Sequence, residues 1–144
     1  MHVAAVLKRK GSRIVSAVPA DTIASIAQLL TEHRIGAVLI VGDDGRPVGI
    51  LSERDIVRAI ARDGAGALVR PAADLMTRDL ITGRPTDTVA DMMAVMTERR
   101  IRHVPILENG GVIGVISIGD VVKARIDDAE LEVESLRGFV AGIG

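Results

Sequence analysis

The chain has 144 residues, of which 48% are hydrophobic, so it is long enough for one compact domain or for two half-domains that share a core. The formal net charge of −1 provides no overall field that would draw the protein to nucleic acid or to an anionic membrane. The absence of cysteine excludes disulfides, thiolate metal sites and a cysteine nucleophile, and the absence of tyrosine and tryptophan leaves no aromatic platform for stacking nucleotide bases.

The apolar runs of the chain are short. The longest, residues 35–41, has the length of a strand and falls far below the roughly 20 residues that span a bilayer. The N-terminus becomes charged at Lys8, too early for a secretory signal. These features predict a cytoplasmic protein with no membrane partner.

The first half of the chain alternates between helical and strand patterns. Asp21 and Thr22 can cap a helix, because apolar residues follow them at helical spacing. The segment Asp43-Asp44-Gly45 is typical of a hairpin turn between two strands rich in β-branched residues. In chain order we expect a helix at about 3–9, a strand within 13–17, a helix at 23–34, strands at 37–41 and 48–51, and a helix at 52–62.

The second half follows the same order after a break at Gly64-Ala-Gly66, where glycine favours a flexible connection. A second turn is predicted at Asn109-Gly110-Gly111. The expected elements are a helix at 71–76, a strand within 80–83, a helix at 87–100, strands at 103–107 and 112–116, and a helix that begins near Ser117.

The two halves are also similar residue by residue, which indicates a tandem repeat. Two similar units are expected to pack on each other with clefts related by a pseudo-two-fold axis, and function is expected there. We place repeat 1 at 1–63, the linker at 64–70, repeat 2 at 71–125 and a C-terminal helical extension at 126–144. The matching segments are Pro19-Ala-Asp21-Thr22-Ile-Ala24 with Pro85-Thr-Asp87-Thr88-Val-Ala90, and Gly49-Ile-Leu-Ser52-Glu-Arg-Asp55 with Gly114-Val-Ile-Ser117-Ile-Gly-Asp120.

The last helix carries an apolar stripe that continues beyond the repeat. Its residues are spaced alternately by four and three positions, which is a heptad-like pattern. The stripe either packs on its own domain or pairs with the same helix of a second chain, and the second interpretation predicts a homodimer. The stripe consists of Val122, Ile126, Ala129, Val133, Leu136 and Val140.

Each repeat ends in a Ser-x-x-Asp motif at a strand-to-helix junction, at Ser52 to Asp55 and at Ser117 to Asp120. One interpretation is structural, since a serine followed three residues later by an acid is close to a helix capping box. The other is functional, because a carboxylate in the first helical turn can accept both hydroxyls of a ribose while nearby amides hold an oxyanion. The two interpretations are compatible.

This doubled pattern resembles a cystathionine-β-synthase (CBS) domain pair, also called a Bateman module, over about residues 1–125. The resemblance implies an α/β (α+β) fold of tandem repeats, each a small β-sheet flanked by two helices. It also implies a regulatory, dimeric module that binds adenosine derivatives between its repeats. The residues that carry it are Asp21-Thr22, Ser52 and Asp55 in the first copy, and Asp87-Thr88, Arg102-His103-Val-Pro105, Ser117 and Asp120 in the second.

The second copy has the stronger candidate site. Asp120 is preferred for ribose because Gly119 leaves room for a ligand beside the backbone. Arg102 and His103 are the candidates for phosphate, since an arginine fork makes paired, charge-assisted hydrogen bonds, although this basic cluster also fits a solvated helix end. The resemblance adds a contact from the preceding strand at Thr82, which equally fits a plain polar strand residue. The full candidate set is Asp120, Ser117, Gly119, Ile118, Thr82, Arg102, His103 and Pro105.

The first copy is expected to hold a weaker or empty site. Gly36 and Ala37 stand where the second copy has Arg102 and His103. Arg54 follows its serine and either serves phosphate or is solvated at the helix start. The candidate residues of this second cleft are Asp55, Ser52, Arg54, Ser16 and Ala37.

The chain holds none of the usual catalytic or phosphate-loop motifs, and His2 and His33 have no partner at metal-ligand spacing. We therefore expect no enzyme, no catalytic residues and no metal. The predicted ligand is AMP, ADP, ATP or NAD(H), with S-adenosylmethionine ranked below them. An unknown effector protein would read the bound state, and nucleic acid is not expected as a partner. The alternative is a dimeric protein–protein interaction module with vestigial nucleotide clefts.

Overall fold

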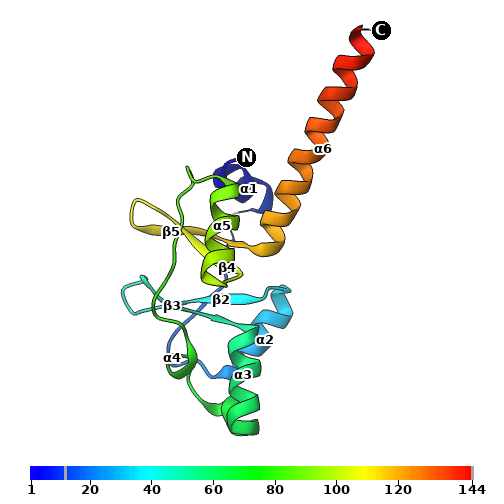
Figure 1. Ribbon diagram of the computed structural model, residues 1–144. Coiled ribbons are helices and arrows are strands. Elements are labelled where there is room, and N and C mark those ends of the chain that lie inside the picture. The colour runs from blue at the N-terminus through cyan, green and yellow to red at the C-terminus, as the bar shows by residue number, and fades with distance from the viewer. Residues whose placement is uncertain (12, 144) are drawn as a thin grey trace. The chain divides into compact units, whose positions relative to one another are not determined.

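The computed structural model describes residues 1–11 and 13–143, with side chains up to residue 138. The chain forms two compact units (Figure 1). Unit 1 comprises Met1–Ser12 and Thr82–Gly144, and unit 2 comprises Arg13–Ile81. Both units combine helices with a small sheet, which confirms the predicted mixed fold class.

Unit 2 is a three-stranded sheet with helices packed on it. Its strands are β1 (Ser16–Ala17), β2 (Ala37–Val41) and β3 (Pro47–Ser52), in the order β1-β2-β3. The β1–β2 pair is parallel and the β2–β3 pair is an antiparallel hairpin. The helices are α2 (Ile23–His33), α3 (Glu53–Asp63), the 3₁₀ helix η1 (Gly64–Val69) and α4 (Ala72–Leu75).

Unit 1 repeats this plan. The hairpin of β4 (His103–Glu108) and β5 (Gly111–Ser117) is antiparallel. The strand expected within 80–83 is reduced to one parallel bridge between Gly83 and Ile106, in which the Gly83 N–H donates to the Pro105 carbonyl at 2.9 Å. The helices are α1 (Val3–Lys10), α5 (Val89–Arg99) and α6 (Ile118–Ile143), the last continuing the chain directly from β5.

The short helix that opens each sequence repeat packs in the unit formed mainly by the other repeat. In unit 1, the Val3 N–H of α1 donates to the Asp87 carbonyl at 2.9 Å. In unit 2, the Ala72 N–H of α4 donates to the matching Asp21 carbonyl at 2.8 Å. The compact units therefore do not coincide with the sequence repeats, because each unit draws its short helix from the opposite repeat.

Each unit has its own apolar core. The unit 1 core joins α1 to the inner faces of α5, α6 and the β4–β5 hairpin, and the unit 2 core joins α4 to α2, α3 and the β2–β3 hairpin. The largest fully buried side chains include Val3, Val104, Ile106, Ile116 and Val121 in unit 1, and Ile23, Ile26, Val38, Leu39, Ile40 and Leu51 in unit 2.

One glycine in each hairpin allows the short helix to come close. A Cβ atom on Gly114 would lie 2.6 Å from the Cδ2 atom of Leu7 in α1. A Cβ atom on Gly49 would lie 2.7 Å from the Met76 sulfur and 3.0 Å from the Thr77 carbonyl oxygen, just after α4. A Cβ atom at either position would force the Leu7 or Met76 side chain to move, and at Gly49 it would also crowd the Thr77 backbone, so glycine favours this close packing of helix and hairpin.

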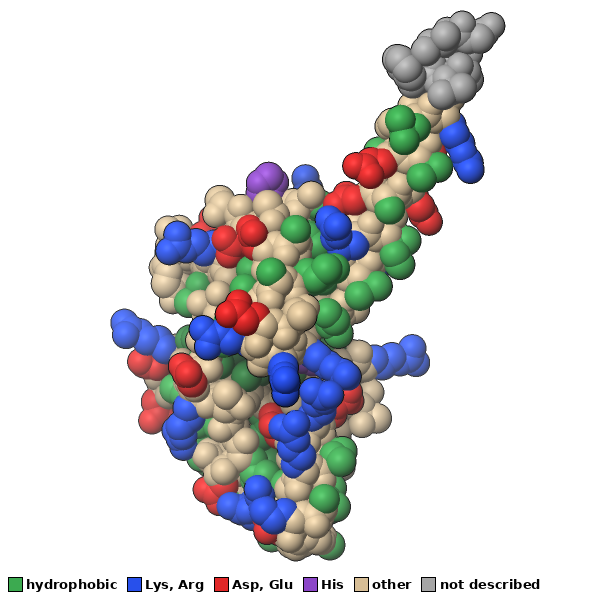
Figure 2. All heavy atoms as spheres, viewed as in Figure 1, with side chains coloured by type: hydrophobic (Ala, Val, Ile, Leu, Met, Phe, Trp, Pro, Cys, Tyr) green, Lys and Arg blue, Asp and Glu red, His purple; other side chains and the backbone are tan. Residues whose placement is uncertain are grey.

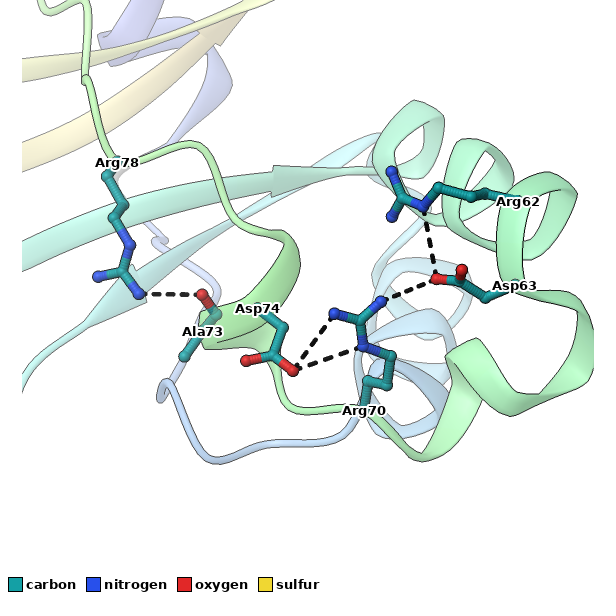
Figure 3. Close-up of polar contacts among 6 residues, drawn as sticks. All are labelled: Arg62, Asp63, Arg70, Ala73, Asp74 and Arg78. Carbon is teal, nitrogen blue, oxygen red and sulfur yellow. Dashed lines mark hydrogen bonds and ion pairs between the residues drawn. The ribbon is translucent and has the colours of Figure 1, made fainter.

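The segment between α3 and α4, which the sequence suggested as a linker at 64–70, is the 3₁₀ helix η1, and its Ala67 is fully buried. Arg70 follows η1 and holds two acidic side chains, Asp63 at 2.8 Å and Asp74 at 3.4 Å (Figure 3). An Arg78 guanidinium N–H donates to the Ala73 carbonyl at 3.0 Å. These contacts join the end of α3 to α4 within unit 2.

We predict that Gly49→Ala lowers the free energy of unfolding by about 1–3 kcal/mol, because the new methyl group meets a backbone carbonyl that is fixed in a bridge with Ile50. Gly66→Ala in the same unit is the matched control, since no atom lies within 4 Å of its Cβ position. Urea unfolding followed by far-ultraviolet circular dichroism suits a chain without tryptophan or tyrosine. Equal stabilities for the two variants would show that the close approach is dispensable.

Candidate functional site

Each of the two candidate residue sets falls within one compact unit. All residues proposed for the stronger site, from Thr82 to Asp120, belong to unit 1. All residues proposed for the weaker site, from Ser16 to Asp55, belong to unit 2. The two sets can therefore be compared as equivalent positions on equivalent hairpins.

The β4–β5 hairpin brings the basic pair and the Ser-x-x-Asp motif of unit 1 together. His103 is paired with Ser117 in the antiparallel register. The Ile118 N–H donates to the Arg102 carbonyl at 2.8 Å. The beginning of β4 and the beginning of α6 are thus adjacent, so Arg102 and His103 lie next to the first turn of α6.

The remaining residues of the set differ in exposure. Thr82 and Gly119 are exposed, and Ser117 and Ile118 are partly buried. Thr82 precedes Gly83, which bridges to the middle of β4. Pro105 is fully buried, and its carbonyl accepts the Gly83 N–H, so its side chain serves the packing of unit 1.

Both Ser-x-x-Asp motifs form reciprocal helix caps. The Ser117 N–H donates to Asp120 Oδ2 at 2.8 Å, and the Asp120 N–H donates to Ser117 Oγ at 3.2 Å. Ser52 and Asp55 make the same pair of bonds at 2.9 and 3.4 Å. The capping interpretation is therefore confirmed for both copies, and it fixes each carboxylate at the start of its helix.

A lysine that sequence patterns did not single out completes the arrangement in unit 1. Lys10, the last residue of α1, places its ammonium nitrogen 2.7 Å from Asp120 Oδ2 and 2.7 Å from the Val115 carbonyl oxygen. The cap and the ion pair both use Oδ2. The start of α6 thus combines the Lys10–Asp120 ion pair with the exposed Arg102, whose backbone carbonyl accepts the Ile118 N–H, so basic residues outnumber the carboxylate there, which suits an anionic ligand.

The surroundings of Asp120 lower its pKa below the usual value of 3.8. Partial burial acts in the opposite direction and raises the pKa, because it disfavours the charged form. The hydrogen bonds from the Lys10 ammonium and from the Ser117 N–H outweigh that effect, since both stabilise the carboxylate. Asp120 is therefore an anion throughout the physiological pH range.

The equivalent position in unit 2 has fewer charges. The Glu53 N–H donates to the Gly36 carbonyl at 2.9 Å, in the same way as Ile118 to Arg102, which shows that Gly36 occupies the place of Arg102. Asp55 makes no ion pair among the described residues. Ala37 is buried, whereas Ser16 and Arg54 are exposed. The asymmetry seen in the sequence thus extends to the lysine that pairs with the carboxylate.

A shallow groove of about 480 Å³ lies in unit 2 between the end of α2 and the start of α3. Gly36 and Glu53 line it, next to Ser52, and the rest of its wall is mostly aliphatic. The groove therefore lies beside the weaker candidate site but offers it only one positive side chain, Arg34. The lining residues are Ala27, Leu30, Thr31, Arg34, Ile35, Gly36, Glu53, Ile56 and Val57.

Among the described residues, no helix combines the length and the apolar character that crossing a membrane requires. The family model described as "CBS domain" matches the chain twice, at residues 5–62 and 72–127. The two matches coincide with the two halves of the sequence repeat and leave out only the ends and the segment that contains η1.

Among curated relatives, the CBS domain-containing protein CBSX3, mitochondrial, of Arabidopsis thaliana is 36% identical over 126 residues. The alignment covers 85% of this chain and 61% of the plant protein, so this chain corresponds to part of that relative.

Two solved structures extend the likeness to the fold. The CBS-domain containing protein ATU1752 from Agrobacterium tumefaciens has a TM-score of 0.84 and 43% identity, covering 86% of this chain and 92% of its own. The CBS domain pair of protein MJ0100, solved with 5′-methylthioadenosine and S-adenosyl-L-methionine, has a TM-score of 0.77 and 25% identity, covering 86% and 98%.

We predict that Asp120→Asn destabilises the protein in a pH-dependent manner. Because the folded pKa of Asp120 lies below its unfolded value, its contribution to stability is present above about pH 4 and is lost as the pH falls through the folded pKa. Urea unfolding near pH 7 should therefore separate the variant from the wild type, and the difference should shrink near pH 3. A difference that stays constant with pH would contradict the role given to the Lys10–Asp120 pair.

Proposed function

The chain belongs to the CBS domain family, whose model matches it in two repeats, and on this premise we propose that it is a regulatory module that binds an adenosine-containing ligand. The fold of the module supports a binding role, since a CBS pair of the same fold was solved with 5′-methylthioadenosine and S-adenosyl-L-methionine. The proposal names the start of α6 in unit 1 as the principal site.

The observation that carries the proposal is a fixed carboxylate beside a basic strand end. Asp120 is held through Oδ2 by its cap and by Lys10, which leaves Oδ1 to accept ribose hydroxyls. A carboxylate that is already oriented loses little freedom on binding, so its hydrogen bonds contribute more to affinity. The exposed Gly119 lets the ligand approach the backbone at this point.

The phosphate position is assigned to Arg102 and His103. His103 is the residue that is paired with Ser117 in the antiparallel hairpin. The adenine would lie against Thr82 and the aliphatic side chain of Ile118, since the sequence has no tyrosine or tryptophan on which it could stack. The excess of positive charge favours the anionic ligands AMP, ADP, ATP and NAD(H). It disfavours S-adenosylmethionine, because a cationic sulfonium would meet Lys10 and Arg102.

The proposed output is binding coupled to a change of conformation, with no catalysis. A ligand with different affinity for two arrangements of the module shifts their populations, and an effector protein reads the shift. The proposal extends to a homodimer that works in the cytoplasm. A second candidate function, a protein–protein interaction module, is favoured by the exposed apolar residues on α6, among them Ile126, Val133 and Leu136.

The test of ligand class is a dye-based thermal shift with AMP, ADP, ATP, NAD⁺, NADH, S-adenosylmethionine and 5′-methylthioadenosine. A ligand at 100 times its dissociation constant adds about 2.7 kcal/mol of stability, which raises the melting temperature by several degrees in a protein of this size. We expect a shift with at least one of the phosphate-containing ligands. No shift with any compound at millimolar concentration would refute the sensor and leave the interaction module.

We predict that Asp120→Ala weakens the binding of the ligand found in that screen by about ten- to a hundredfold, because ribose hydrogen bonds to a charged group are lost. Asp91→Ala is the matched control, since Asp91 forms the same type of capping box with Thr88 at the start of α5. Calorimetry with both variants separates loss of a cap from loss of a ligand contact. Equal effects of the two changes would contradict the ribose assignment.

Arg102→Ala tests the phosphate assignment separately. It should weaken AMP binding by at least tenfold and leave adenosine binding nearly unchanged, because only the phosphate meets the guanidinium. The exposed Arg58 of α3, which belongs to neither candidate set, provides the control substitution, Arg58→Ala. If AMP and adenosine lose affinity equally in the Arg102 variant, the residue acts on the fold of the site and not on the phosphate.

A further inference from the structure

The apolar stripe of α6 is not covered within its own unit. The face of α6 that packs on the unit 1 core contains Val121 and Ala124, which are buried. The stripe predicted from the sequence lies on a different face, where Ile126 is 53% exposed and Leu136 is 65% exposed. Figure 2 shows hydrophobic side chains along the exposed part of this helix, interspersed with charged ones. Val140, the last residue of the predicted stripe, lies outside the described side chains.

The charged residues of α6, like its apolar residues, differ between the face that packs on unit 1 and the exposed face. On the inner side, Asp127 forms an ion pair with Arg9 of α1 at 2.7 Å. The five charges that flank the described stripe form no ion pair among the described residues. They are Lys123, Arg125, Glu130, Glu132 and Arg137. Unpaired charges beside an exposed apolar stripe are the arrangement that a second helix would complete.

The stripe follows a heptad in which the buried seam positions are named a and d. Ile126 and Val133 then occupy position a, and Val122, Ala129 and Leu136 occupy position d. β-Branched residues at a with leucine at d favour a two-stranded parallel coiled coil; both a residues here are β-branched, and one of the three d residues, Leu136, is leucine. A groove of about 430 Å³ along this face, lined by residues that include Ile126, Ala129 and Val133, provides space for the opposing side chains.

We propose that α6 pairs with α6 of a second copy of this chain as a short parallel coiled coil. In that register, position g of one helix meets position e of the next heptad on the other helix. Arg125 at g then meets Glu130 at e of the partner copy, and Glu132 at g meets Arg137 at e. Both pairs are attractive and each occurs twice by symmetry, so four of the five unpaired charges find a partner of opposite sign, and Lys123 at e meets the uncharged Ile118 at g.

An antiparallel pairing satisfies the same charges less completely. There, e faces e and g faces g, so one antiparallel register sets Glu130 against itself and Lys123 against Arg137, and it leaves Val122 outside the contact. A shifted antiparallel register brings Arg125 to Glu132 and Lys123 to Glu130, but it leaves Leu136 outside the contact. The parallel register alone pairs the whole stripe from residue 122 to residue 136 with complementary charges.

The contact is narrow, about 20 Å long at 1.5 Å per residue, so we expect a reversible dimer with a dissociation constant on the order of micromolar. The inference stands apart from ligand binding, because none of its residues belongs to the candidate nucleotide site. Its failure would leave the sensor proposal intact, and the absence of any ligand would leave the dimer intact.

Charge exchange across the proposed pair tests the register. Arg125→Glu or Glu130→Arg alone should weaken the dimer by roughly tenfold, because each creates two like-charge contacts. The double variant restores opposite charges in the parallel register and should regain the wild-type dissociation constant within about threefold. In the shifted antiparallel register the double variant instead sets its new carboxylate at position 125 against Glu132. Its dimer would then be weaker than the dimer of either single variant. Sedimentation equilibrium with interference optics measures all four proteins.

Mixing the two single variants adds a second test. The Arg125→Glu variant has acidic residues at both positions 125 and 130, and the Glu130→Arg variant has basic residues at both. In the parallel register the mixture should form heterodimers tighter than either homodimer. Arg125 and Glu130 are both exposed, so the variants should retain the wild-type circular dichroism spectrum and melting temperature.

The cysteine-free sequence allows an orientation test by single cysteines. Ala129→Cys at position d should form a disulfide between copies under mild oxidation, because identical d residues face each other only when the helices are parallel and in register. Leu131→Cys is the matched control, since Leu131 is 58% exposed on α6 but lies off the stripe. Equal cross-linking of the two variants, or a wild type that is monomeric at about 100 µM, would overturn the proposal, as would a double variant weaker than both single ones.

Discussion

The close packing of a short helix against a glycine in each hairpin is the constraint on which the rest of this structure depends. Leu7 of α1 rests on Gly114, and Met76 rests on Gly49 in the same way. Neither hairpin could bury its inner face without that helix, because each of the two cores includes residues of the short helix it receives. Each short helix comes from the opposite sequence repeat. The two units are therefore complete only because the repeats exchange their first helices.

The exchange also determines the chemistry at the start of α6. Lys10 reaches Asp120 only because α1 packs against β5, and the turn of helix that carries Lys10 has no counterpart in the four-residue α4. The carboxylate of unit 2, Asp55, has the same cap but forms no ion pair among the described residues. The two equivalent sites therefore differ in charge for two reasons. The helix α1 is longer than α4 and so carries Lys10, and unit 2 has Gly36 at the position that Arg102 occupies in unit 1.

Local features of the sequence predicted most of the fold, and non-local features escaped prediction. The hairpins and main helices follow from apolar periodicity, turn residues and caps that act within a few positions, as at Thr88 and Asp91. The sequence indicated a glycine-rich break between the repeats at Gly64-Ala-Gly66, but not that this segment forms a 3₁₀ helix with Ala67 buried and Arg70 paired with Asp63. Tertiary contacts decided the outcome there.

The candidate site shows the same division. Ser117, Asp120 and the basic pair could be recognised because motif and strand register place them together. Lys10 could not, since it is separated from Asp120 by the whole of unit 2 in sequence, and only the exchange of α1 brings them into contact. Pro105 looked like part of the site because it stands in the same motif as Arg102, but its side chain is fully buried.

The exchange of helices has a consequence for how the chain is made. Unit 2 is one continuous segment, Arg13–Ile81, so all of its contacts are available once that stretch has left the ribosome. Unit 1 joins the first residues synthesised to the last, and α1 has to wait for β5 and α6 before it can bury Val3 and Leu7. Vectorial synthesis therefore orders the two folding events, with the continuous unit first and the discontinuous unit closing around a helix that was translated before either.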